Sequence, residues 1–151
     1  MTRLITIEDL YQMKFLSRPR ISPDGQQVAY VVTRINERKH EYRSAIWLSS
    51  VDGSAAHRFS AESGHTSDPT WSPDGRWLAF VSDREGEVSD NEAKKRSKGK
   101  PQIWLIPTDG GEAQQLNFME HGASSPVWSP DSKRLLVSAA RPPTTGDGTP
   151  R

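Results

Sequence analysis

The sequence predicts an all-β fold, an incomplete β-propeller of about two and a half four-stranded blades preceded by a short N-terminal helix. The segment from Trp71 to Phe80 has one close copy before it and one after it, and a second hairpin pattern recurs between the copies. The copies are 50 and then 57 residues apart. Periods of this length, with four short strands each, are typical of propeller blades, and no long 3.6-residue pattern supports a helical repeat.

The first hairpin of each repeat turns at Ser-Pro-Asp-Gly, residues 22–25 and 72–75, or at Ser-Pro-Asp-Ser, residues 129–132. Proline presets the first turn position, aspartate suits the second, and glycine accepts the positive φ that follows. The apolar runs 28–32 and 78–81 then predict buried strands. Ser132 replaces the glycine, and a non-glycine residue at positive φ costs about 1–2 kcal/mol. We therefore expect the third copy to turn differently.

The second hairpin of each repeat joins an Ile-Trp-Leu strand to an Asp-Gly turn, at 46–53 and again at 103–110. Both copies begin 26 residues before the next repeat serine, so the seven extra residues of the longer period lie within residues 84–100. We expect blades at about 19–68 and 69–125, and an incomplete blade at 126–151. A propeller closes with about four to eight blades, so we expect this chain to be the first part of a longer propeller.

The N-terminus predicts a short helix within the leader segment 1–18. Thr6 is suited to the N-cap, Glu8 and Asp9 fall in the first turn, and apolar residues continue to about Leu16. Two interpretations stay open for this helix. It caps the first blade, which is the usual role of a short amphipathic helix, or it docks against another domain.

Composition limits the classes of partner. The net charge of +1 and the pI near 8.1 disfavour a nucleic-acid partner. Lys94-Lys95-Arg96 follows several acidic residues in the loop 84–100, which favours an exposed loop over a nucleic-acid patch. No apolar run is long enough to span a membrane, cysteine is absent, and the first residues lack the apolar core of a secretory signal. We expect a cytoplasmic protein with no membrane segment.

No residue set predicts a reaction. A G-x-S-x-G elbow, a phosphate loop and a dinucleotide fingerprint are all missing from the sequence, and its four histidines fall in separate loops. The side chains of the repeated turn aspartates are expected to form hydrogen bonds with the backbone of their own turns, and the same role is expected for Asp83. The tryptophans are expected to pack between blades. We assign no catalytic, cofactor-binding or metal-binding residue. The turn aspartates are Asp24, Asp74 and Asp131; the tryptophans are Trp47, Trp71, Trp77, Trp104 and Trp128; the histidines are His40, His57, His65 and His121.

Taken in order, these segments resemble the start of the prolyl oligopeptidase family of serine peptidases. The leader Thr6-Ile7-Glu8-Asp9-Leu10 runs into the first Ser-Pro-Asp-Gly repeat, followed by Ile46-Trp47-Leu48 and the repeat at Trp71. The acylaminoacyl-peptidase and dipeptidyl-peptidase-like branch is the most similar, and the resemblance extends to about Ala140. TolB-like propellers share the individual repeats, and the leader helix is what favours the peptidase.

This resemblance implies a non-catalytic N-terminal propeller fragment that gates access of short or N-acylated peptides to a C-terminal α/β-hydrolase domain. The serine, aspartate and histidine of the family lie in that domain, so the resemblance places no catalytic residue on this chain. Its partners would be the hydrolase domain and peptide substrates, without a cofactor. The alternative is a TolB-like scaffold that binds a protein and catalyses nothing. A third possibility is a short protein whose copies assemble into a homo-oligomeric propeller.

Overall fold

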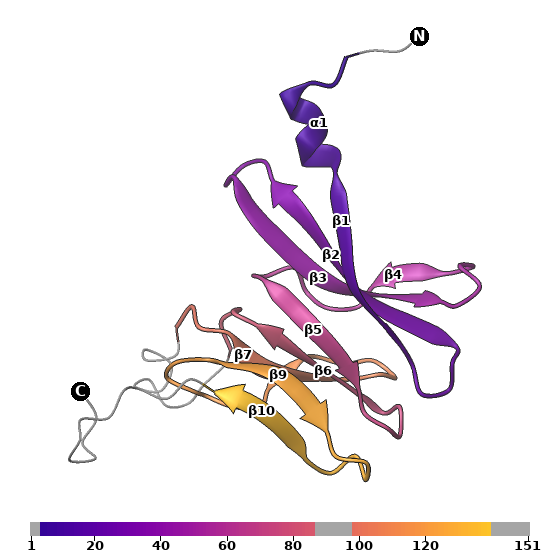
Figure 1. The fold of residues 1–151 in the computed structure, drawn as a ribbon. Coiled ribbons are helices and arrows are strands. Elements are labelled where there is room, and N and C mark those ends of the chain that lie inside the picture. The colour runs from indigo at the N-terminus through magenta and orange to yellow at the C-terminus, as the bar shows by residue number, and fades with distance from the viewer. Residues whose placement is uncertain (1–3, 87–97, 140–151) are drawn as a thin grey trace, which may run out of the picture.

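A computed structural model describes residues 4–86 and 98–139, which form a short helix followed by three antiparallel sheets (Figure 1). Strands that follow one another in the chain are neighbours in each sheet. The expected four strands per repeat and the incomplete propeller are confirmed. The first sheet contains β1 (Lys14–Ile21), β2 (Gln27–Asn36), β3 (Glu41–Ser50) and β4 (Ala56–Arg58); the second contains β5 (Thr66–Trp71), β6 (Trp77–Ser82), β7 (Gln102–Pro107) and β8 (Gln114–Gln115); the third pairs β9 (Ala123–Trp128) with β10 (Leu135–Ala139).

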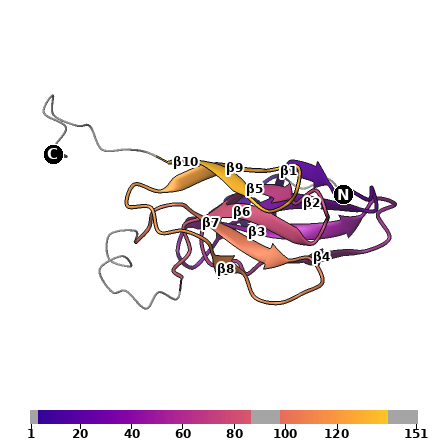
Figure 2. The same cartoon turned by 90° about the horizontal axis from the view of Figure 1, so that it is seen from below.

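The sheets pack face to face as successive blades. Figure 2 shows the first strands β1, β5 and β9 towards one side of the layers and the last strands β4 and β8 towards the other. A core cluster fills the space between the first two blades, and a smaller one lies between the second and the third. The first cluster contains Ala29, Ile46, Leu48, Leu78, Phe80, Trp104 and Ile106; the second contains Val81, Ile103 and Ala123, with Leu135 and Val137 against it. Burial between blades thus provides the apolar stabilisation.

Each Ser-Pro-Asp turn is fixed by its own side chains. In the first, Ser22 Oγ donates to Asp24 Oδ1 at 2.5 Å, and the same carboxylate accepts the Gln26 N–H at 3.1 Å. Ser22 Oγ also accepts the Gln27 N–H at 2.9 Å. The turns at 72–77 and 129–134 repeat these bonds within about 0.1 Å. The expected role of the repeated aspartates is confirmed, and it explains why serine and aspartate recur together.

The third turn does not differ, so that expectation was wrong. Ser132 has φ of 59°, close to the 71° of Gly25 and the 72° of Gly75. Its N–H bonds the Ser129 carbonyl at 2.9 Å, as in the other turns. Ser132 Oγ also accepts the backbone N–H of Asp74 in the neighbouring blade at 3.0 Å. Glycine cannot make this bond, and the bond offsets the backbone strain at Ser132.

Removing the Ser132 hydroxyl tests this account. Ser132→Ala keeps the strained φ and removes the bond to Asp74, so it is expected to lower the free energy of unfolding by about 0.5–1.5 kcal/mol. Ser132→Gly loses the same bond but relieves the strain, so its cost is expected to be smaller. Urea denaturation of both variants checks the order. An alanine variant as stable as the parent would show that the bond contributes nothing.

Acid is expected to destabilise the turns. The hydrogen bond from the neighbouring serine, together with a backbone N–H, holds the pKa of Asp24, Asp74 and Asp131 below the ordinary value of 3.8. A carboxyl whose pKa is lower in the folded state stabilises the fold above its unfolded pKa, and the contribution disappears as pH falls through the folded pKa. The urea concentration at the midpoint of unfolding should therefore decrease as the pH is lowered below about 4. The decrease should be less steep in a variant with all three aspartates changed to Asn. An equally steep decrease in both proteins would contradict this cause.

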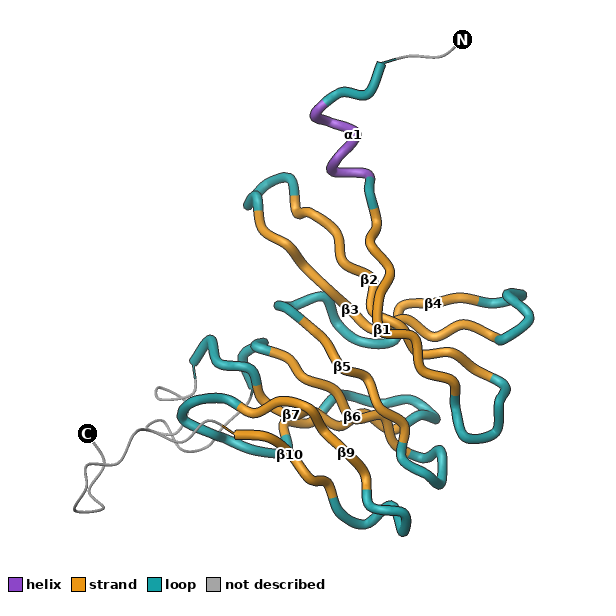
Figure 3. Tube along the Cα trace, viewed as in Figure 1, coloured by secondary structure: helices purple, strands orange, loops and turns teal. Residues whose placement is uncertain are grey.

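Helix α1 (Ile7–Gln12) ends earlier than the expected Leu16, because the chain from Lys14 onwards pairs with β2. The Thr6 N–H donates to Asp9 Oδ2 at 2.8 Å, which supports the expected start at Thr6. No residue of α1 is buried. The helix precedes β1 and extends away from the sheets (Figure 3), so it does not cover the core as a cap would. In the part of the chain that the structure describes, no helix is long and apolar enough to cross a membrane.

The first strand of each described blade carries a bulge before its proline, which we did not predict from the sequence. Arg18, Asp68 and Ser125 have φ of 55°, 50° and 51°, and the pairing register shifts at these positions. Each is followed by the proline of its repeat, and proline within a strand is a signal for a bulge. The bulges line a pocket of about 370 Å³ shared by β1, β5 and β9.

Two of the expected tryptophan contacts between blades are confirmed at one repeat position. The Trp71 indole N–H donates to the Arg20 carbonyl at 3.0 Å, and the Trp128 indole donates to the Thr70 carbonyl at 3.2 Å. Trp104 belongs to the core between the first two blades. Trp47 is only partly buried, and the Lys14 ammonium lies 6.0 Å from its ring.

Candidate functional site

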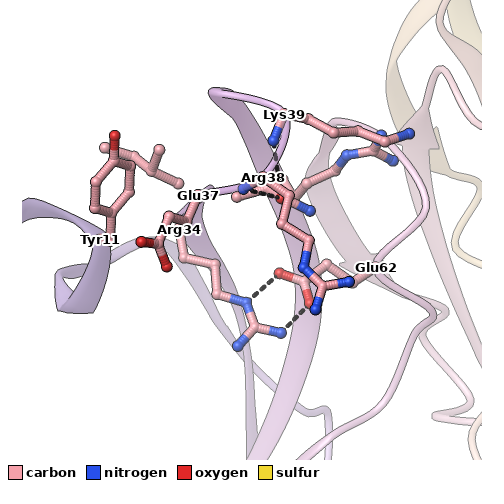
Figure 4. Close-up of a pocket in the computed structure, with 9 residues that line it drawn as sticks. Tyr11, Arg34, Glu37, Arg38, Lys39 and Glu62 are labelled. Carbon is pink, nitrogen blue, oxygen red and sulfur yellow. Dashed lines mark hydrogen bonds and ion pairs between the residues drawn. The ribbon is translucent and has the colours of Figure 1, made fainter.

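A pocket of about 590 Å³ lies beside α1 at the end of the first blade (Figure 4). Strands β2 and β3 form its wall, because their ten-residue ladder continues to the pair Asn36 and Glu41, whereas β6 and β7 have six residues each. Tyr11 of α1 and Glu62 of the connector after β4 approach it from other directions. The pocket is lined by Tyr11, Arg34, Ile35, Asn36, Glu37, Arg38, Lys39, Arg43 and Glu62.

A tight turn at the tip of the β2–β3 hairpin presents the cations. Asn36 Oδ1 accepts the backbone N–H groups of Arg38 and Lys39 at 3.1 and 3.3 Å, and His40 has φ of 50°. An asparagine that bonds the residues after it is a common way to stabilise such turns. His40 Nδ1 lies 3.2 Å from Tyr11 Oη, which connects the hairpin tip to α1. The backbone is therefore held while the side chains of Arg38 and Lys39 stay exposed.

One carboxylate of the pocket is already neutralised. Arg34 donates to both oxygens of Glu62 through Nε and a terminal nitrogen, and Arg58 lies 3.7 Å from the same carboxylate. The hydrogen bond from Arg34 is the main cause that lowers the pKa of Glu62, and the same bond raises the pKa of Arg34. Both groups therefore stay charged at neutral pH, and the forked pair fixes the floor of the pocket.

A second arginine occupies the same repeat position. Arg34 and Arg84 each follow their repeat serine by 12 residues, and both reach the connector between the first two blades. Arg84 donates to the Ala61 carbonyl at 3.3 Å, and its guanidinium lies 5.0 and 5.1 Å from the rings of Phe80 and Trp104. Burial lowers the pKa of Arg84. The repeat offset was the signal that could have identified these residues in the sequence.

The structure also joins two residues that no sequence pattern connects, His65 and Asp83. Asp83 accepts the backbone N–H of His65 at 2.7 Å with one oxygen and lies 2.9 Å from His65 Nδ1 with the other. A side chain at Gly64 would overlap this carboxylate, so glycine permits the contact. Asp83 therefore differs from the turn aspartates, because it orients a histidine. An oriented histidine alone does not make a nucleophilic site, which needs a hydroxyl or thiol beside it.

No group of three or more metal-ligating side chains forms among the described residues. His57 contacts Phe59, and His121 lies in the turn before β9, so within residues 4–86 and 98–139 the four histidines stay separate. The basic residues Lys94-Lys95-Arg96 lie outside the described residues. The described surface offers charged pockets suited to binding.

Comparison with known proteins identifies the family. Residues 11–144 match the family model of the TolB beta propeller domain, and the chain belongs to this family. It is 36% identical, over 93% of its length, to an uncharacterized peptidase of Bacillus subtilis, YuxL. The chain spans only 20% of that relative.

Two solved structures have the same fold. The acylaminoacyl peptidase of Pyrococcus horikoshii aligns over 91% of this chain and 19% of its own, with 25% identity and a TM-score of 0.66. The propeller domain of the Trilobed protease from Pyrococcus furiosus aligns over 84% of this chain and 34% of its own, with 25% identity and a TM-score of 0.61. The resemblance to the N-terminal propeller portion of a prolyl oligopeptidase family peptidase is thereby confirmed.

Proposed function

We propose that this chain is the non-catalytic, N-terminal part of the propeller in a cytoplasmic serine peptidase that hydrolyses short or N-acylated peptides. The observation that carries the proposal is the match of about nine-tenths of the chain to one part of larger peptidases. In this account an α/β-hydrolase domain follows the propeller in the same polypeptide and supplies the serine, aspartate and histidine for acyl transfer. The propeller limits which peptides reach them.

The exposure of helix α1 favours the interpretation that it docks against another domain over the interpretation that it caps the first blade. Its apolar side chains are exposed, and Phe15 and Leu16 of the following strand β1 are exposed as well. Contiguous exposed apolar residues of this kind mark an interaction surface in a soluble protein. We place the hydrolase domain against this surface, on the side where the chain enters the first blade. The exposed residues are Leu4, Ile5, Ile7, Leu10, Met13, Phe15 and Leu16.

A fluorophosphonate probe tests the proposal, because it reacts with an activated serine nucleophile. The protein made from the whole reading frame is expected to be labelled and to hydrolyse acyl-amino-acid or dipeptide chromogenic substrates. Residues 1–151 alone are expected to do neither. Labelling of residues 1–151, or an unlabelled and inactive whole-frame protein, would contradict the proposal.

The alternative is a TolB-like scaffold that binds a protein partner without chemistry, which the description of the matched family favours. An exposed docking helix suits this function equally well. The two functions differ in the probe experiment, since a scaffold gives no labelling in any form of the protein.

A further inference from the structure

We infer that the pocket between α1 and the β2–β3 hairpin binds a carboxylate, either the terminal carboxylate of a short peptide or an acidic side chain of one. The inference rests on the proposed function for the class of ligand, since a peptidase propeller meets short peptides. The pocket volume of about 590 Å³ is in the range of small-ligand sites.

The charge balance of the pocket favours an anion. Four cations and two carboxylates line it. Arg34 is paired with Glu62, and Arg43 is paired with Glu41 at 2.8 Å. Among the residues that the structure describes, Arg38 and Lys39 have no ion pair. Glu37 is the remaining lining carboxylate, so two unpaired cations face one unpaired carboxylate.

The geometry favours one bound carboxylate over anions that are attracted without a defined site. A guanidinium presents parallel N–H donors that match the two oxygens of a carboxylate, and such forked bonds are stronger than neutral ones. The Asn36 bonds hold the backbone beneath Arg38 and Lys39, so less ordering is needed when a ligand binds. Tyr11 adds an aromatic wall beside the cations (Figure 4). The pocket thus places one aromatic ring beside a group of cations.

Three probes separate the sources of the carboxylate: N-acetyl-Ala-Ala as the free acid, the same peptide as its amide, and N-acetyl-Glu-Ala amide. Each is titrated into residues 1–151 in low salt and followed by backbone amide NMR shifts. The free acid is expected to shift signals of residues 36–41 and to bind about tenfold more tightly than the plain amide. Binding of the glutamyl amide as tight as that of the free acid assigns the site to acidic side chains, and weaker binding assigns it to the peptide terminus.

Charge variants locate the site. Arg38→Gln with Lys39→Gln is expected to weaken binding of the free acid about tenfold. Glu37→Gln removes the opposing charge and is expected to strengthen binding about threefold, a gain that misfolding cannot produce. Arg76→Gln with Lys133→Gln changes the same residue types in the Ser-Pro-Asp turns and serves as the matched control. Equal binding of acid and amide, an unchanged Glu37 variant, or an equal loss in the control would overturn the inference. The probe labelling of the whole protein is independent of each of these results.

Discussion

Replacing Phe80 by alanine is expected to lower the free energy of unfolding by about 3–5 kcal/mol. Phe80 is fully buried in the cluster between the first two blades, beside residues such as Ile46 and Leu78. Truncation removes its transfer free energy and leaves a cavity between two sheets that backbone pairing keeps from collapsing. Urea denaturation followed by tryptophan fluorescence measures the change.

Phe118 provides the matched control for this change. It lies in the same blade and is 40% exposed, so Phe118→Ala is expected to cost less than about 1 kcal/mol. A loss at Phe80 no larger than the loss at Phe118 would mean that the interface between the first two blades is not the core of the molecule.

Replacing Arg84 by alanine is expected to cost about 2–4 kcal/mol, an unusually large effect for a cation. The side chain stacks on Phe80 and Trp104, and it donates to the Ala61 carbonyl and to Ser82 Oγ, the latter at 3.2 Å. Stacking of a partly desolvated cation on aromatic rings and charge-assisted hydrogen bonds both contribute. The alanine variant loses both at once.

Arg84→Lys tests whether geometry or charge matters. Lysine keeps the charge but has neither the planar face nor the fork of donors, so we expect it to restore less than half of the lost stability. Full restoration by lysine would show that charge alone acts at this position. Arg34→Lys in the first blade is the natural comparison, because Arg34 pairs with Glu62 at the surface. This change is expected to lower the free energy of unfolding by less than Arg84→Lys does.

The repeats predicted the fold because each turn is specified by its own residues. The hydrogen bonds of the serine and the aspartate join residues at most five positions apart, so the turn could be predicted without the neighbouring blade. Ser132 shows the limit of local reasoning. The cost of a positive φ at Ser132 led us to expect a different turn, but the compensating bond to Asp74 comes from 58 residues away in the sequence. The early end of α1 has the same cause, since pairing of Lys14 with Arg34 depends on β2.

The pocket could be predicted only in part. The charged segment 34–43 was visible as a connector, but a charge run by itself gives no sign of which cations are paired. Pairing of Arg34 with Glu62 joins strand β2 to the connector after β4, and the contact of Tyr11 with His40 joins the helix to a hairpin. Both depend on the tertiary arrangement. The equal offset of Arg34 and Arg84 from the repeat serines was the available local signal.

The most direct test of the account is the sequence of the encoding gene beyond the codon for Arg151. We predict that the frame continues through further blades of about 50 residues and then encodes a G-x-S-x-G segment, followed by an aspartate and a histidine in that order. A frame that completes the propeller without such a segment would contradict the peptidase account and favour the scaffold. A stop codon directly after Arg151 would contradict it as well and would direct attention to assembly of several copies.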